Sequence, residues 1–179
     1  ELNLALNGAY NSMRLTTDYK VPLMMAMDNG STDLGVSRGV CSALMNQGQG
    51  TQAPTDGAFL TIYSNFYTGI ARTNALLENM VRAKDVVPET KYNQIEAQAL
   101  FIRAFHYMYL TELWGDVPFL DKVIKTPEEG MIPREEKKVI VDRILADLEK
   151  AAEVLPYKWE GEPERITKGA VLGLHARIS

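Results

Sequence analysis

The chain has 179 residues, 46% of them apolar, which is enough for the hydrophobic core of one globular domain. Its formal charge of −4, from 19 basic and 23 acidic residues mixed along the sequence, gives no basic stripe for nucleic acid and no polybasic patch for a membrane surface. No apolar run approaches the ~20 residues that a membrane-spanning helix needs, and the single cysteine, Cys41, excludes an internal disulfide.

Helical spacing of apolar residues runs through most of the sequence. Apolar residues recur at intervals of three and four, which is the helical period. Alternating runs rich in Val, Ile and Thr are scarce, so we predict a nearly all-α fold. A short helix is expected from Leu2 to Met13, and a second one, capped by Asp18, in the following residues. From Asp28 to Gly57 the sequence turns to Gly, Ser, Thr, Asn and Gln, which predicts a long polar loop.

Two long helices are predicted in the middle of the chain. The first ends at Val81, and the second runs from Lys91 to Trp114, with Pro88 in the link between them. Two such helices joined by a short link form an αα-hairpin. The second helix is apolar on more than one face, so we expect it to have neighbours on two sides.

Two further helices are predicted near the C-terminus. One runs from Val141 to Leu155 with a charged outer face, and the other runs from Lys168 to the last residue, with Thr167 as its N-cap. Because the hairpins do not start at even intervals, the fold is predicted to be an irregular array of tetratricopeptide-like helical hairpins, an αα superhelix. An exposed apolar face is expected on the last helix, around Leu172, Leu174 and Ile178.

Three polar residues fall in apolar surroundings of the predicted helices. Arg103 is expected to be partly buried and therefore to need a carboxylate, for which Glu78 and Glu112 are the candidates. Asn74 is expected to bond across to a neighbouring helix or to cap a turn. His106 is expected to be a core histidine, because no set of His, Cys and Glu residues has metal-ligand spacing. Ligand binding is the alternative for Arg103 and Asn74.

The remaining charged and reactive residues predict no catalysis. Arg143 and Asp147, four residues apart, are expected to pair on the surface of their helix. Glu128 and Glu129 are adjacent and would point to different faces of a helix. Cys41 has no nearby histidine to act as a base. The sequence therefore predicts no catalytic residue, no cofactor and no metal.

Carbohydrate contact is the binding chemistry that the composition allows. Sugar rings stack their C–H faces on exposed aromatic side chains, while amides and carboxylates bond the hydroxyls. Trp159 lies in a polar stretch between two predicted helices, and the 28–57 loop supplies Asp33, Asn46 and Gln49. These four residues are the predicted ligand contacts. The loop composition also fits any surface loop, so that interpretation stays open.

Six ordered motifs resemble the SusD/RagB family, and the resemblance covers the whole chain. The most specific lies between Arg103 and Pro118. In chain order the motifs are Tyr63-x3-Tyr67-x2-Ile70-x3-Asn74, Ala97-x2-Leu100-x2-Arg103-Ala104-x2-Tyr107-x2-Leu110, Gly115-Asp116-Val117-Pro118, Pro133-Arg134, Ile144-Leu145-x-Asp147-Leu148-x2-Ala151 with Leu155-Pro156, and Arg165-x-Thr167-Lys168-x-Ala170.

The resemblance implies a cell-surface lipoprotein of the outer membrane in Bacteroidetes-type bacteria. Such a protein is not an enzyme; it would capture an oligosaccharide or similar nutrient and pass it to a SusC-like TonB-dependent transporter. Residues 1–179 would be the N-terminal part of the family fold, with the C-terminal part absent and membrane attachment only through a lipid anchor missing from this chain. The alternative is a helical-repeat protein-interaction module without a small-molecule ligand.

Overall fold

The computed structural model describes residues 1–15, 23, 50, 51, 53, 55 and 57–179. The described residues form α-helices and two 3-10 helices with no named strand, which confirms the all-α prediction. The elements are α1 (Leu2–Ser12), α4 (Gly57–Met80), η1 (Val81–Ala83), α5 (Glu89–Trp114), η2 (Glu128–Gly130), α6 (Lys137–Val154) and α7 (Lys168–Ile178). The predicted second helix and most of the 28–57 loop lie outside the described residues.

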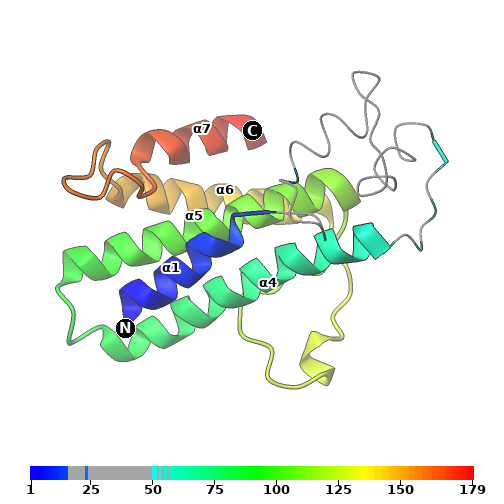
Figure 1. Ribbon diagram of the computed structural model, residues 1–179, viewed down its shortest axis with the longest axis horizontal. Helices are drawn as coiled ribbons and strands as arrows, with labels where there is room; N and C mark the ends of the chain where they lie inside the picture. Colours follow the sequence, from blue (N-terminus) through cyan, green and yellow to red (C-terminus); the bar gives the residue numbers. More distant parts are fainter. Residues whose placement is uncertain (16–22, 24–49, 52, 54, 56) are drawn as a thin grey trace. The chain divides into compact units, whose positions relative to one another are not determined.

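The chain divides into two compact units. One consists of residues 1–13 and 68–179, and the other of residues 14–67, so α4 contributes to both. In the larger unit α5 is the central helix: it packs against α6, also contacts α1 and α7, and runs beside the second half of α4 (Figure 1). α6 packs in turn against α7.

The burial of α5 follows from its sequence. Its apolar residues occupy more than one face, and residues on both predicted faces are buried, among them Ile95, Ala99, Ile102, Phe101 and Met108. A helix of this kind is stable only with neighbours on several sides. The predicted two-sided packing of this helix is confirmed, although the helix begins at Glu89 and not at Lys91.

The helix ends match the local sequence signals. Pro88 precedes α5, and Gly115, with φ of 71°, follows its last residue, because a glycine adopts positive φ without a Cβ clash. Thr167 Oγ1 accepts a hydrogen bond from the Ala170 amide at 3.3 Å, as an N-cap does. The end of α5 at Trp114 and the N-cap of α7 at Thr167 are as predicted.

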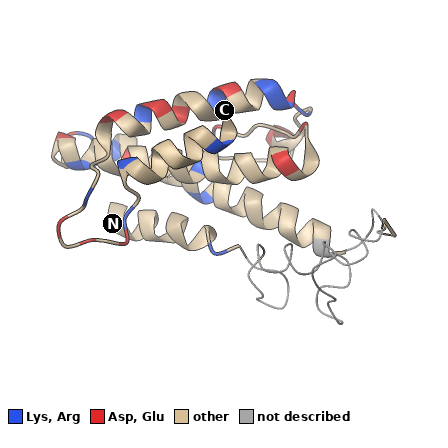
Figure 2. Ribbon diagram, turned by 90° about the horizontal axis from the view of Figure 1, so that it is seen from above, with Lys and Arg blue, Asp and Glu red and all other residues tan. Residues whose placement is uncertain are grey.

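α6 is amphipathic, with charges of both signs along its outer side (Figure 2) and buried Ile140, Ile144 and Leu148 on its inner side. It begins at Lys137, ahead of Val141, the first residue of the predicted apolar stripe. The exposed face predicted on α7 is only partly present: Leu172 is 45% exposed, but Leu174 is 8% exposed. That part of the prediction is wrong because α7 packs against α6. None of the described helices has the length and hydropathy to cross a bilayer.

Candidate functional site

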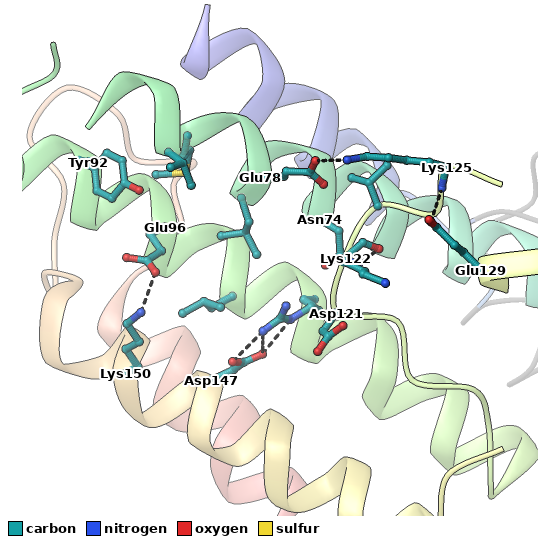
Figure 3. Close-up of a pocket in the computed structure, with 16 residues that line it drawn as sticks. Asn74, Glu78, Tyr92, Glu96, Asp121, Lys122, Lys125, Glu129, Asp147 and Lys150 are labelled. Carbon is teal, nitrogen blue, oxygen red and sulfur yellow. Dashed lines mark hydrogen bonds and ion pairs between the residues drawn. The ribbon is translucent and has the colours of Figure 1, made fainter. Parts of the chain in front are cut away.

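The larger unit contains a cleft of about 700 Å³ between α4, α5, α6 and the segment 121–129 (Figure 3). Apolar side chains form part of its lining: Leu77, Met80, Val81, Leu100 and Val123. Asn74 and Tyr92 contribute neutral polar groups. The rest of the lining is charged and includes both signs: Glu78, Glu96, Arg103, Asp121, Lys122, Lys125, Glu129, Asp147 and Lys150.

Arg103 on α5 binds Asp147 on α6 through several hydrogen bonds. Nε donates to Oδ2 at 2.9 Å, and Nη2 donates to Oδ1 at 2.9 Å and to Oδ2 at 2.7 Å. The two side chains are 12% and 16% exposed. Burial raises the pKa of the Asp147 carboxyl, and Arg103 opposes that effect. This pair joins the two helices at one wall of the cleft.

The ion-pair partners differ from the prediction. Arg103 binds neither Glu78, which pairs with Lys125, nor Glu112, which pairs with Arg177. The reason is that Asp147 lies on the helix that packs against α5. Arg143 does not bind Asp147 either.

Arg143 instead contacts two side chains from the segment before α6, Glu135 and Phe119. Its Nη2 donates to Glu135 Oε1 at 2.8 Å, and its guanidinium lies over the Phe119 ring at 4.7 Å from the ring centroid. A helical spacing of four allows a pair, but Asp147 faces α5 and is taken by Arg103. Both corrections therefore follow from the position of this one carboxylate.

Two further ion pairs lie at the cleft (Figure 3). Lys125 Nζ donates to Glu78 Oε1 at 2.9 Å, and Lys150 Nζ donates to Glu96 Oε1 at 2.6 Å. These pairs are more exposed than the Arg103 pair, with lysines 65% and 57% exposed. The hydrogen bond and charge of Glu78 raise the pKa of Lys125, and the same bond lowers the pKa of Glu78.

The wall formed by the α5–α6 connection is fixed by two buried side chains. Asn74 on α4 donates from Nδ2 to the carbonyls of Leu120, at 2.8 Å, and Lys122, at 3.3 Å. The Tyr107 hydroxyl accepts from the Leu120 amide at 2.6 Å. Asn74 thus bonds across the fold as predicted, but to a connection and not to a helix. Tyr107 had no predicted site role, although it stands in the motif that contains Arg103.

His106 is fully buried on α5, which confirms the prediction of a core histidine. Its Nε2 lies 2.9 Å from Ser12 Oγ, a contact that resembles a nucleophile–base pair. However, Ser12 Oγ donates its proton to the Ala9 carbonyl at 2.6 Å. The histidine nitrogen must then donate to Oγ, so it cannot act as a base there. Burial lowers the pKa of His106 to about 4.

The predicted ligand contacts are only partly described. Asp33, Asn46 and Gln49 lie outside the described residues. Trp159, in the loop that connects α6 to α7, is half-buried, and its indole Nε1 donates to the Ile166 carbonyl at 2.8 Å. It lines a depression of about 40 Å³ that shares no residue with the cleft. Its role in sugar contact stays a prediction.

The polar neighbours of Trp159 come from α1, α5 and its own loop. They include Asn3, Gln94, Gln98, Glu162 and Arg165. Among the described residues, no group of three or more His, Cys, Asp or Glu side chains could hold a metal ion.

Several relatives and solved structures are similar to this chain. It is 29% identical over 159 residues to SusD-like protein P2 of Formosa agariphila, covering 87% of this chain and 31% of that protein. It is 30% identical over 120 residues to SusD-like protein P25 of the same organism, covering 65% of this chain and 22% of that one.

The fold matches a laminarin-binding SusD-like protein with a TM-score of 0.86 at 22% identity, covering 99% of this chain and 39% of that one. Surface glycan-binding protein A of Bacteroides thetaiotaomicron, in complex with laminarihexaose, matches with a TM-score of 0.79 at 21% identity. The match covers 99% of this chain and 38% of that one. The chain spans about a third of the length of SusD-like protein P2. A family described as starch-binding and associating with the outer membrane matches residues 6–179, and the chain therefore belongs to this SusD-like family.

Proposed function

We propose that this chain is the helical part of a non-catalytic, cell-surface protein that captures an oligosaccharide and passes it to a SusC-like TonB-dependent transporter in the outer membrane. The observation that carries this proposal is the family match over residues 6–179. Two structures with the same fold are of proteins described as binding laminarin or laminarihexaose. The chain's mixed charge and lack of a basic stripe favour an uncharged ligand of this type over nucleic acid.

The contacts proposed for the sugar are those expected from the sequence: Trp159, with Asp33, Asn46 and Gln49 of the polar loop. Trp159 has its indole N–H bonded to a backbone carbonyl, which fixes the ring plane. A fixed aromatic ring loses little conformational freedom on binding, and a ring face is the group on which a sugar stacks. The amides of Gln94 and Gln98 are close enough to line the same depression.

Isothermal titration calorimetry with laminarihexaose and maltohexaose tests the binding step. Saturable binding of either glucan, weakened by Trp159→Ala, is the expected result. The transfer step is tested by affinity purification from outer membranes of a native host, where a TonB-dependent transporter should copurify. If neither glucan binds while a protein partner copurifies, the helical-repeat interaction module becomes the better interpretation.

A further inference from the structure

The cleft between α4, α5 and α6 is separate from the depression at Trp159. We propose that this cleft is a second oligosaccharide subsite and that it favours neutral glycans over anionic ones. The inference rests on the proposed glycan-binding function and assigns a place and a ligand chemistry within it. The volume of the cleft, about 700 Å³, falls in the range of about 300–1,000 Å³ that is usual for small-ligand sites.

The cleft offers an aromatic face beside a polar pair. Tyr92 and Glu96 stand four residues apart on α5 and lie next to each other in Figure 3. The Tyr92 side chain is partly exposed. A pyranose ring stacked on it would bring its hydroxyls to Glu96 and to Lys150, which are hydrogen-bonded to each other at 2.6 Å. Apolar Leu77 and Leu100 line the same space.

The ion pairs of the cleft match the chemistry of a hydroxyl group. An ammonium has three donors, and a carboxylate accepts at about four lone-pair positions, so a pair that shares one hydrogen bond keeps capacity for others. Glu96–Lys150 and Glu78–Lys125 each hold a donor and an acceptor side by side. A sugar hydroxyl can accept from the ammonium and donate to the carboxylate at once.

The balance of charge disfavours an anionic ligand. The lining contains five carboxylates and four cations. Three of the cations, Arg103, Lys125 and Lys150, are already paired with carboxylates. The fourth cation, Lys122, is exposed and stands next to the exposed Asp121 in the sequence. With five carboxylates against four cations, the lining carries a net negative charge that disfavours a sulfate or uronate group.

The walls of the cleft are held in place by hydrogen bonds within the chain. Arg103 and Asp147 join α5 to α6, while Asn74 and Tyr107 hold the connection that carries Asp121. A pre-formed site avoids the free-energy cost of ordering loops and side chains on binding. The geometry is thus suited to an uncharged ligand with many hydroxyl groups, which gains from fixed donors and acceptors.

Calorimetry of the chain with laminarihexaose, and with the same hexasaccharide carrying sulfate groups, tests the proposal. Lys150→Gln should weaken binding of laminarihexaose about tenfold, as loss of a hydrogen bond to a charged group would. Tyr92→Ala should weaken it by a similar factor because it removes the ring on which the sugar stacks. Tyr92→Phe should keep most of the affinity because it keeps the ring. Lys138→Gln is the matched control on α6, since Lys138 is exposed and does not line the cleft. Thermal melts establish that each variant is folded.

The possible outcomes distinguish failure of the proposed subsite from failure of the proposed function. If laminarihexaose binds, and Trp159→Ala weakens binding while Tyr92→Ala and Lys150→Gln do not, the cleft is not a subsite and the proposed function stands. If the sulfated hexasaccharide binds more tightly, the preference for neutral glycans is wrong. If the unmodified chain binds neither laminarihexaose nor maltohexaose, the proposed function fails and the subsite fails with it.

Discussion

Gly69 on α4 lies directly against the imidazole of His106 on α5: a Cβ built on Gly69 would overlap the ring and come within 2.6 Å of its Cδ2 atom. His106 is fully buried, so its ring has no free space into which to move. We expect Gly69→Ala to lower the free energy of unfolding by about 1–3 kcal/mol, the range for overpacking in a core. Urea denaturation measures this change.

Gly173 is the matched control for that substitution. It is also within a helix, α7, but a Cβ there meets no atom within 4 Å. Gly173→Ala should therefore be neutral or stabilise the protein by up to about 1 kcal/mol, through helix propensity alone. Equal stability of the two alanine variants would show that the close approach of α4 to His106 is not as described.

The buried imidazole of His106 also makes stability depend on pH. Burial lowers its folded-state pKa from 6.5 to about 4. Between these values the unfolded chain binds a proton at this residue and the folded chain does not, so the free energy of unfolding falls as pH falls. The contribution is fully present above pH 6.5 and decreases by about 3 kcal/mol on going down to pH 4.

Urea denaturation at several pH values checks this prediction against the variant His106→Gln, which has no titrating ring. The difference in unfolding free energy between the two proteins should shrink by about 3 kcal/mol from pH 7 to pH 4. The carboxyl groups titrate in both proteins, so their contributions to the unfolding free energy cancel in the difference. A difference that does not change with pH would mean that the ring is reached by solvent in the folded protein.

The helices could be predicted because their signals are local. Apolar spacing, Pro88 and Gly115 set the limits of α5, and Thr167 marks the start of α7. The packing of α7 could not be predicted in the same way. Leu172 and Leu174 are equally apolar, and only the direction in which α6 approaches decides that Leu174 is the buried one.

The candidate site was harder to predict because its contacts join residues far apart in the sequence. The sequence indicates that Arg103 needs a carboxylate, but it does not indicate which helix provides one. Asp147 is 44 positions away and was expected to bind Arg143. Asn74 likewise reaches a carbonyl 46 positions away. Long-range pairs of this kind depend on how the helices pack, which composition and periodicity do not specify.

The Arg103–Asp147 pair should contribute strongly to stability. Both side chains are mostly buried, and removing one of them leaves the other charge without compensation. We expect Arg103→Met to lower the free energy of unfolding by about 3 kcal/mol. The double variant Arg103→Met with Asp147→Leu should recover most of that loss, because no unpaired charge remains. Chemical denaturation of the single and double variants gives the coupling energy.

The exposed pair between Glu78 and Lys125 provides the comparison. Both side chains are largely accessible to solvent, and exposed pairs contribute about 0–1 kcal/mol. Lys125→Met should thus have little effect on stability. If Arg103→Met and Lys125→Met were equally mild, the Arg103 pair would have to be solvated in solution, and its role in joining α5 to α6 would be wrong.

Tyr107 fixes the α5–α6 connection through its hydroxyl, which lies 2.6 Å from the Leu120 amide nitrogen. The ring stacks on Phe119, with 4.5 Å between the centroids, and would stay in place in Tyr107→Phe. This variant loses the hydroxyl alone and leaves the Leu120 amide without its acceptor, so we expect a loss of about 1–3 kcal/mol in stability. Amide hydrogen exchange at Leu120 should become faster.

The same experiment distinguishes a local role of Tyr107 from a global one. Asn74 holds the Leu120 carbonyl independently, so Asn74→Ala should also speed exchange in this connection. Exchange at Leu148, in the core of α6 and away from both hydroxyl and amide, should then change only as far as global stability does. If Tyr107→Phe accelerated exchange at Leu148 and Leu120 equally, the hydroxyl would act on the whole core, and the specific hold on the cleft wall would have no support.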